Sequence, residues 1–141
     1  MHGVTITELI KKFKLKNATP DIDTDKIVLT HPDVNRPALQ LTGFFDHFDR
    51  ERVQIVGYVE QAYINTLTRE AKRAVYEKLT SSQIPCLVFS RGQNPDEDLL
   101  EYCSYYSVPC LVSQKTTSNL MAEVIRWLNV KLAPCISITA C

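Results

Sequence analysis

The sequence predicts a single α/β domain in which a mainly parallel sheet is flanked by helices. Short apolar runs rich in β-branched residues alternate with segments whose apolar residues recur at helical spacing. One strand pattern also occurs twice, in residues 84–90 and again in residues 108–113, with a helical segment between the copies. Two strands joined in this way are expected to be parallel neighbours with a right-handed crossover.

The N-terminal part is predicted to contain a helix, a loop and a strand. Thr5 and Glu8 form a capping box, and the apolar residues that follow have helical spacing, so the first helix runs to about Lys14. Residues 17–25 are polar and predict a loop. Residues 26–30 are rich in β-branched side chains and predict a strand.

The middle of the chain is predicted to contain a short helix, a strand and two helices in series. Pro37 suits the first position of a helix, because its missing amide hydrogen would be unpaired there, and Gly43 would end that helix. Residues 53–57 predict a strand, and residues 58–67 predict a helix. Thr68 can cap the helix that follows.

Two longer helices are predicted in the C-terminal part. Asn94 is expected to cap, and Pro95 to start, a helix that runs to about Tyr106, with acidic residues in its first turn that complement the helix dipole. The last helix runs from about Ser118 to Lys131, because apolar residues recur there at every fourth position.

Length and charge restrict the possible partners. A chain of 141 residues is long enough to bury one core, so residues 1–134 are assigned to one domain and residues 135–141 to a C-terminal tail or linker. Lys plus Arg equals Asp plus Glu at 16 each, which gives no net field towards nucleic acid or an anionic membrane. Without an apolar run of membrane-spanning length or a signal peptide, we expect a cytoplasmic protein with no nucleic-acid or membrane partner.

The sequence indicates no metal site. The five cysteines are odd in number and include no C-x-x-C pair, so they are interpreted as reduced thiols, at least two of them on buried strands. Asp21, Asp23 and Asp25 imitate the start of a calcium loop. However, Lys26 and Pro32 stand where that loop needs glycine and glutamate. We expect no metal and no cofactor in this chain.

A cysteine and a histidine could form a nucleophile pair, because such partners meet in space and not in sequence. Cys86 or Cys110 with His31 or His47 would be that pair. Buried thiols and a loop histidine are the simpler interpretation, and we adopt it.

The best candidate ligand site lies beyond the carboxyl ends of the predicted parallel strands, where open α/β sheets bind ligands. Arg91 and Gly92 follow one strand, and Thr116, Thr117 and Ser118 follow the other. Their amides and hydroxyls, with nearby cations, could hold a phosphate or a carboxylate. In the alternative that we favour, Gly92 serves a turn, Thr117 or Ser118 caps the last helix, and the cations are solvated.

Four further residues are candidates for contacts. Arg36 either binds the same ligand or ties loops together by donating to backbone carbonyls. Phe44, Phe45 and Phe48 form an aromatic cluster beside charged residues, which is either a partner-binding patch or part of the core. The sequence leaves both alternatives open.

Four stretches, residues 33–57, 85–92, 109–112 and 131–134, carry a family resemblance that includes Asn35-Arg36-Pro37 and Leu132-Ala133-Pro134. They resemble the N-terminal domain of HPr kinase/phosphorylase, the bacterial enzyme that phosphorylates and dephosphorylates a serine of the phosphocarrier HPr. The resemblance covers nearly the whole chain. It implies an α/β fold like the first domain of the Mur ligases, and a hexameric parent that uses ATP or pyrophosphate with magnesium in carbon catabolite control.

The chain departs from that family where its chemistry would begin. A kinase of this family needs a loop of the form G-x-x-x-x-G-K-[ST], and none of the four glycines is followed by lysine. Where the family's catalytic domain starts with His-Gly-Val, this chain reads Thr139-Ala140-Cys141. We therefore expect a non-catalytic domain for assembly or regulation, whose partners are the catalytic domain of the same protein and, through it, HPr. The alternative is a stand-alone sensor of small anions that uses the strand-end residues.

Overall fold

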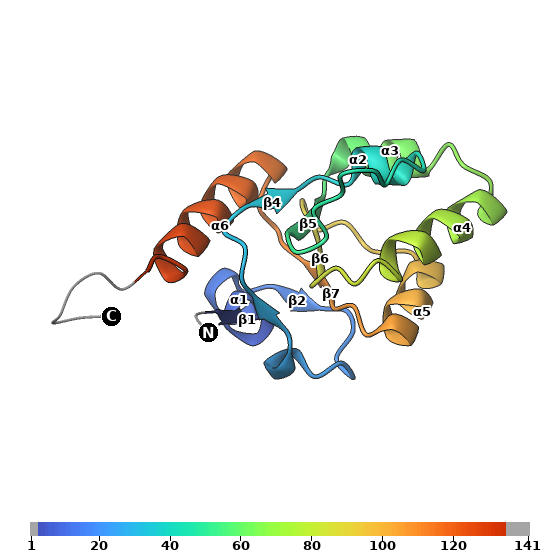
Figure 1. The fold of residues 1–141 in the computed structure, drawn as a ribbon. Helices are drawn as coiled ribbons and strands as arrows, with labels where there is room; N and C mark the ends of the chain where they lie inside the picture. The colour runs from blue at the N-terminus through green and yellow to red at the C-terminus, as the bar shows by residue number, and fades with distance from the viewer. Residues whose placement is uncertain (1–2, 135–141) are drawn as a thin grey trace, which may run out of the picture.

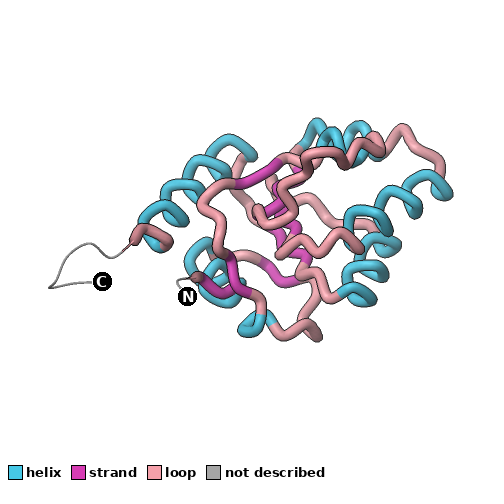
Figure 2. Tube along the Cα trace, in the orientation of Figure 1, coloured by secondary structure: helices cyan, strands magenta, loops and turns pink. Residues whose placement is uncertain are grey.

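The computed structural model describes residues 3–134, so the predicted tail over residues 135–141 lies outside the described part. A five-stranded sheet forms its centre, with helices on both sides (Figures 1 and 2). In spatial order its strands are β2 (Lys16–Asn17), β7 (Cys110–Val112), β6 (Leu87–Phe89), β5 (Val53–Val56) and β4 (Val34–Asn35). A separate two-stranded sheet pairs β1 (Val4–Thr5) with β3 (Val28–Leu29).

The four parallel strands follow one another across the sheet in chain order. The strands β4, β5, β6 and β7 are parallel neighbours, and β2 joins the edge of β7 in the antiparallel sense. Each connection between consecutive parallel strands therefore leads to the next strand in the same direction across the sheet. When all these connections have the same handedness, their helices lie on the same face of the sheet. These helices are α2 (Ala38–Leu41), α3 (Tyr58–Ile64), α4 (Arg69–Thr80) and α5 (Glu97–Tyr106).

The other face of the sheet is covered by α1 (Ile6–Phe13) and α6 (Thr117–Lys131), which lie away from α4 and α5 in Figure 1. Alternate residues of each strand serve the two faces. Ile55 and Val88 pack with α1 and α6, whereas Val56 and Phe89 pack with the crossover helices. Because both faces are buried, the central strands are apolar throughout, as expected for a parallel sheet. Each fully buried side chain of this kind stabilises the fold by about 1.5–3 kcal/mol.

Several predicted elements are confirmed. The capping box of Thr5 and Glu8 starts α1, and the side chain of Thr68 accepts a hydrogen bond from the amide of Ala71 to start α4. The repeated strand pattern forms β6 and β7, which are adjacent and parallel with α5 between them in the chain. Residues 3–134 contain no helix that is long and apolar enough to cross a membrane.

The strand prediction for the N-terminal part was incomplete. The predicted strand over residues 26–30 is shorter, because Thr24–Lys26 form a 3-10 turn and only β3 is extended. Its partner is β1, so it belongs to the small antiparallel sheet and not to the main one. The strands β1, β2 and β4 were missed. Each is two residues long, which is too short to show a periodic pattern.

The starts of α2 and α5 and the end of α3 also differ from the prediction. Pro37 is the N-cap of α2 and not its first residue, and α3 ends at Ile64. The N-cap of α5 is Asp96 instead of Asn94, so Pro95 lies before the helix. The side chain of Asp96 makes no capping hydrogen bond, because its carboxylate accepts the hydroxyl of Tyr76 at 2.5 Å.

Candidate functional site

The carboxyl ends of the four parallel strands meet at one edge of the sheet. Arg36 follows β4, Gly57 follows β5, Ser90 follows β6 and Ser113 follows β7. The amide of Ser90 donates to the carbonyl of Val56 and the amide of Ser113 to that of Phe89, so pairing continues beyond the strands. The predicted location of the site therefore exists as one continuous edge, which we call the carboxyl edge.

Glu60 binds the first two of these strand ends together. Its Oε1 accepts hydrogen bonds from Nη2 of Arg36 at 2.8 Å, from Nε of Arg36 at 3.3 Å and from the amide of Gly57 at 2.6 Å. The bond to Gly57 is the half of a capping box that a glycine allows at the N-cap of α3. Only 4% of Glu60 is exposed, so this is a charge-assisted network at the margin of the core.

Ser90 and Thr117 connect the end of β6 to the start of α6 at the same edge. Their hydroxyl oxygens are 2.6 Å apart, and both residues are buried. Gly57 lies against this pair: a Cβ atom built on it would be 2.8 Å from Oγ1 of Thr117 and 2.7 Å from Nη2 of Arg36. Glycine is therefore needed here for close packing, although its φ of −98° suits any residue.

Arg91 and Gly92 form a tight turn beside this cluster. Both have positive φ angles, of 57° and 64°. The amide of Arg91 donates to the carbonyl of Lys115, and the amide of Gly92 donates to that of Ser113. A Cβ atom on Gly92 would be 2.6 Å from Oε1 of Gln114, so this position favours glycine for both conformation and space.

The remaining predicted residues are at the start of α6. Thr116 is its N-cap and accepts the amide of Asn119, which corrects the expectation that Thr117 or Ser118 caps this helix. Thr117 is buried with Ser90, whereas Ser118 is exposed. Sequence reasoning also missed Glu60. The spacing of Gly57 and Glu60, from N-cap to N3, is a capping signal that would have located it.

The carboxylate of Glu60 is an anion of the protein itself at the carboxyl edge. Arg36 donates to this carboxylate, whereas one alternative from the sequence expected it to donate to backbone carbonyls. A phosphate or carboxylate ligand would compete with Glu60 for the same guanidinium group. Within residues 3–134, no three His, Cys, Asp or Glu side chains gather as metal ligands.

The aromatic cluster divides between the surface and the core. Phe44 is 48% exposed. Phe45 and Phe48 are partly buried against the core, with their rings edge to face and the centroids 5.5 Å apart. Nζ of Lys78 lies 5.2 Å from the centroid of the Phe45 ring. The contact role of this cluster remains a prediction.

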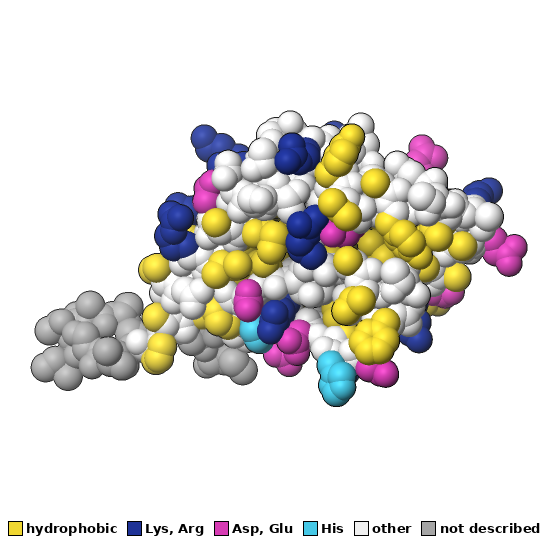
Figure 3. Space-filling view, turned by 90° about the horizontal axis from the view of Figure 1, so that it is seen from above, with side chains coloured by type: hydrophobic (Ala, Val, Ile, Leu, Met, Phe, Trp, Pro, Cys, Tyr) yellow, Lys and Arg dark blue, Asp and Glu magenta, His cyan; other side chains and the backbone are white. Residues whose placement is uncertain are grey.

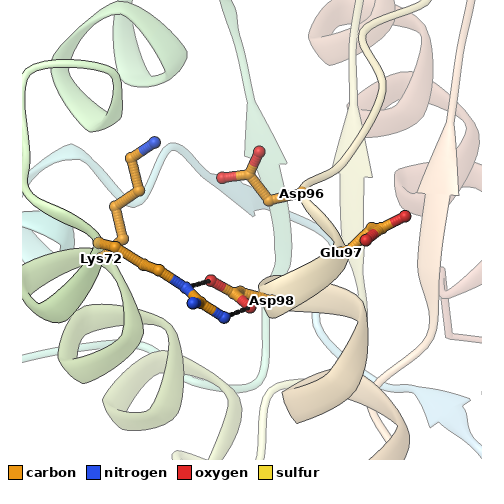
Figure 4. Close-up of a pocket in the computed structure, with 5 residues that line it drawn as sticks. Lys72, Asp96, Glu97 and Asp98 are labelled. Atoms are coloured by element: carbon orange, nitrogen blue, oxygen red, sulfur yellow. Dashed lines mark hydrogen bonds and ion pairs between the residues drawn. The ribbon is translucent and has the colours of Figure 1, made fainter.

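A hollow of about 470 Å³ lies between the N-terminal ends of α4 and α5 (Figure 4). In Figure 4, Lys72 and Asp96 point into the same space and Glu97 points away from it. Arg69 and Arg73 both donate to the carboxylate of Asp98, and these hydrogen bonds hold the pKa of Asp98 below its usual value. The hollow is therefore lined by charges of both signs, and one of them, Asp98 on α5, is paired with arginines of α4.

The buried thiols are not arranged as nucleophiles. The pKa of Cys110 is raised by a hydrogen bond with Cys103 and by burial, and burial raises the pKa of Cys86 to about 12. No histidine contributes to either shift. Because the thiolate is the reactive form, these environments suppress nucleophilic chemistry. Cys135 and Cys141 lie outside the described residues.

Fold and edge together define a singly wound α/β domain whose strand ends are tied to one another. Residues 4–128 match the family described as HPr serine kinase N terminus, and the chain belongs to this family. It is 51% identical to an HPr kinase/phosphorylase from Lachnoclostridium phytofermentans, over 98% of this chain and 45% of that protein. It is 37% identical to one from Caldicellulosiruptor bescii, over 95% of this chain and 43% of that protein. The chain thus spans less than half the length of these relatives.

A solved structure has a similar fold. It is that of the CBS and DRTGG domains of the regulatory region of Clostridium perfringens pyrophosphatase, complexed with the activator diadenosine tetraphosphate. The match has a TM-score of 0.60 and 12% sequence identity, and it covers 92% of this chain and 47% of that one. At this identity the likeness concerns the fold alone.

Proposed function

We propose that this chain acts as the non-catalytic N-terminal domain of an HPr kinase/phosphorylase and serves the assembly or regulation of a catalytic part. One observation carries the proposal: nearly the whole chain matches relatives that are HPr kinase/phosphorylases, but the match covers less than half of the length of each relative. Phosphorylation and phosphorolytic dephosphorylation of a serine of HPr, in carbon catabolite control, are then activities of the whole protein.

The residues of this chain do not fit the cofactors of that reaction. ATP or pyrophosphate and Mg²⁺ need a phosphate-binding loop with lysine and oxygen ligands for the metal. The sequence has no G-x-x-x-x-G-K-[ST] segment, and the strand-end cation Arg36 is engaged by Glu60. We therefore propose that the catalytic domain binds ATP or pyrophosphate, Mg²⁺ and HPr. This N-terminal domain would contact the catalytic domain.

The arrangement of the carboxyl edge supports a scaffold role. Its charged and hydroxyl groups join strand ends to helices, through the pair of Glu60 with Arg36 and the neighbouring pair of Ser90 with Thr117. Such internal pairing stabilises the domain but leaves few groups to bind a substrate.

The test is to incubate the 141-residue chain with HPr, ATP and Mg²⁺ and to measure phosphoserine by mass spectrometry. The Lachnoclostridium phytofermentans relative, at the same concentration, is the positive control. We expect phosphoserine with the relative and none with the chain. Phosphoserine formed by the chain alone would refute the non-catalytic role.

A further inference from the structure

A second hollow, of about 260 Å³, lies between α1 and α6, the two helices that cover the other face of the sheet. Its lining combines two aromatic rings, one aliphatic side chain and three charged ones: Phe13, Trp127, Val130, Lys12, Arg126 and Glu123. The rings of Phe13 and Trp127 stand edge to face with their centroids 5.5 Å apart, and Val130 is 72% exposed. We call this site the α1–α6 hollow.

The charges that line the α1–α6 hollow are not balanced. Its one carboxylate, that of Glu123, is paired with Lys115, whose Nζ lies 3.4 Å from Oε1 of Glu123. Lys12 and Arg126 are exposed, and neither forms an ion pair within residues 3–134. The hollow therefore offers an apolar floor beside two unpaired positive charges.

Positive charge is also concentrated in the two segments that carry the hollow. Residues 6–17 and 115–131 hold seven of the 16 lysine and arginine residues of the chain, but only two of its 16 acidic residues. Figure 3 shows Lys and Arg side chains and hydrophobic side chains at the surface towards the end of the molecule at which α6 ends. An acidic surface with an apolar side chain would be complementary to this part of the molecule.

The length of the relatives indicates which partner lies next to the hollow. The matched family is an N-terminal one, and the match covers only 45% of the Lachnoclostridium phytofermentans relative, so the rest of that protein follows the matched region. A domain that follows α6 begins at the C-terminal end of this helix. Trp127 and Val130 belong to the last two turns of α6, so such a domain starts beside the α1–α6 hollow.

We propose that the α1–α6 hollow is the docking site for the catalytic domain of an HPr kinase/phosphorylase, which contacts it through an acidic segment with an apolar side chain. The apolar side chain would pack on the rings of Phe13 and Trp127, and the acidic groups would pair with Lys12 and Arg126. This inference deepens the role proposed above and rests on it. Because both domains belong to one chain, an effective concentration on the order of 1 mM keeps even a weak contact formed.

The test is hydroxyl-radical footprinting, measured by peptide mass spectrometry. Trp127 is the only tryptophan of the 141-residue chain, so its oxidation reports on the hollow directly. Its oxidation rate is compared between this chain and a replacement protein, in which this chain takes the place of the matching region of the Lachnoclostridium phytofermentans relative. We expect the rate to fall about threefold or more in the replacement protein, because docking excludes water from the ring. Tyr105, which is 79% exposed on α5, should react equally fast in both proteins.

Charge reversal tests the chemistry of the partner. In the replacement protein, Lys12→Glu and Arg126→Glu should return the oxidation rate of Trp127 towards that of the isolated chain, because each repels an acidic segment. Arg50→Glu is the matched control on an exposed cation outside the two basic segments, and it should leave Trp127 protected. Circular dichroism of the same variants in the isolated chain shows whether each one is folded.

Three results would overturn the inference. Trp127 could react equally fast in both proteins, or the folded charge-reversal variants could leave it protected. Protection that appears in the isolated chain as its concentration rises would assign the hollow to a second copy of the chain. Phosphorylation of HPr by the replacement protein is measured separately. Restored phosphorylation with an accessible Trp127 would reject the docking site and leave the role standing, whereas protection without phosphorylation would support the contact and contradict the role.

Discussion

The carboxylate of Glu60 accepts two hydrogen bonds from the guanidinium group of Arg36, at 2.8 and 3.3 Å. This pair joins the residue that follows β4 to the first turn of α3, which follows β5. It therefore links the loops that follow two neighbouring strands and orients α3.

Two substitutions of Glu60 should destabilise the domain to different extents. Glu60→Ala leaves both the guanidinium of Arg36 and the amide of Gly57 without their acceptor, with an expected loss of about 2–4 kcal/mol in the free energy of unfolding. Glu60→Gln keeps an acceptor for Gly57 and should cost about half as much. Urea unfolding measures both. Glu70→Gln, on an exposed carboxylate in the first turn of α4, is the control and should change little. Equal stability of Glu60→Ala and the unmodified chain would contradict this role.

The hydroxyl pair of Ser90 and Thr117 should show energetic coupling. Ser90→Ala leaves the buried hydroxyl of Thr117 without its partner and should cost about 1–3 kcal/mol. The double variant Ser90→Ala/Thr117→Val removes both hydroxyls, so its loss should be smaller than the sum of the two single losses. A double-mutant cycle by urea unfolding provides the measurement, and strict additivity would mean that the pair does not interact.

The buried cysteines should resist alkylation in the folded protein. Cys86, Cys103 and Cys110 are buried, and the pKa of Cys86 and that of Cys110 are raised. With iodoacetamide near neutral pH, we expect these three thiols to react only after denaturation in urea, as peptide mass spectrometry would show. Fast modification of Cys86 or Cys110 in the native chain would instead support a nucleophilic thiol.

Tyr76 should make stability depend on alkaline pH. Burial and its hydrogen bond to Asp96 raise the pKa of Tyr76 above its ordinary value of 10.0. The unfolded chain then releases this proton first, so the stabilisation is complete below about pH 10 and is lost as the pH rises above it. Unfolding measured from about pH 8 to about pH 11 should show a shallower decline for Tyr76→Phe. Tyr105→Phe, on an exposed ring, should keep the original slope, and identical slopes for all three proteins would rule out the effect.

The fold class could be predicted because the elements that define it have clear local signals. The repeated apolar runs gave β6 and β7, and the helical spacing of the last segment gave α6. The two-residue strands β2 and β4 gave no such signal, because the sheet beside them decides their pairing. The start of α5 was misplaced, since the contact of Asp96 with Tyr76 on another helix takes part in setting it.

The placement of the candidate residues at one edge of the sheet could be predicted, but their contacts could not. Topology placed Arg91, Gly92 and the start of α6 at one edge, where the structure has them. Sequence could not show that Arg36 meets Glu60, because 24 residues separate them and the spacing within α3 explains only the bond to Gly57. Long-range pairs of this kind depend on the packing of several elements.

The central claim is that this chain assembles or regulates the catalytic domain of an HPr kinase/phosphorylase. Domain replacement tests this claim most directly. The rate of HPr phosphorylation would be compared for the Lachnoclostridium phytofermentans relative, for the relative without the N-terminal region that matches this chain, and for the relative with this chain in that place. We predict that the deletion alters the rate and that the replacement restores it. A deletion without effect, or a replacement that behaves like the deletion, would contradict the claim.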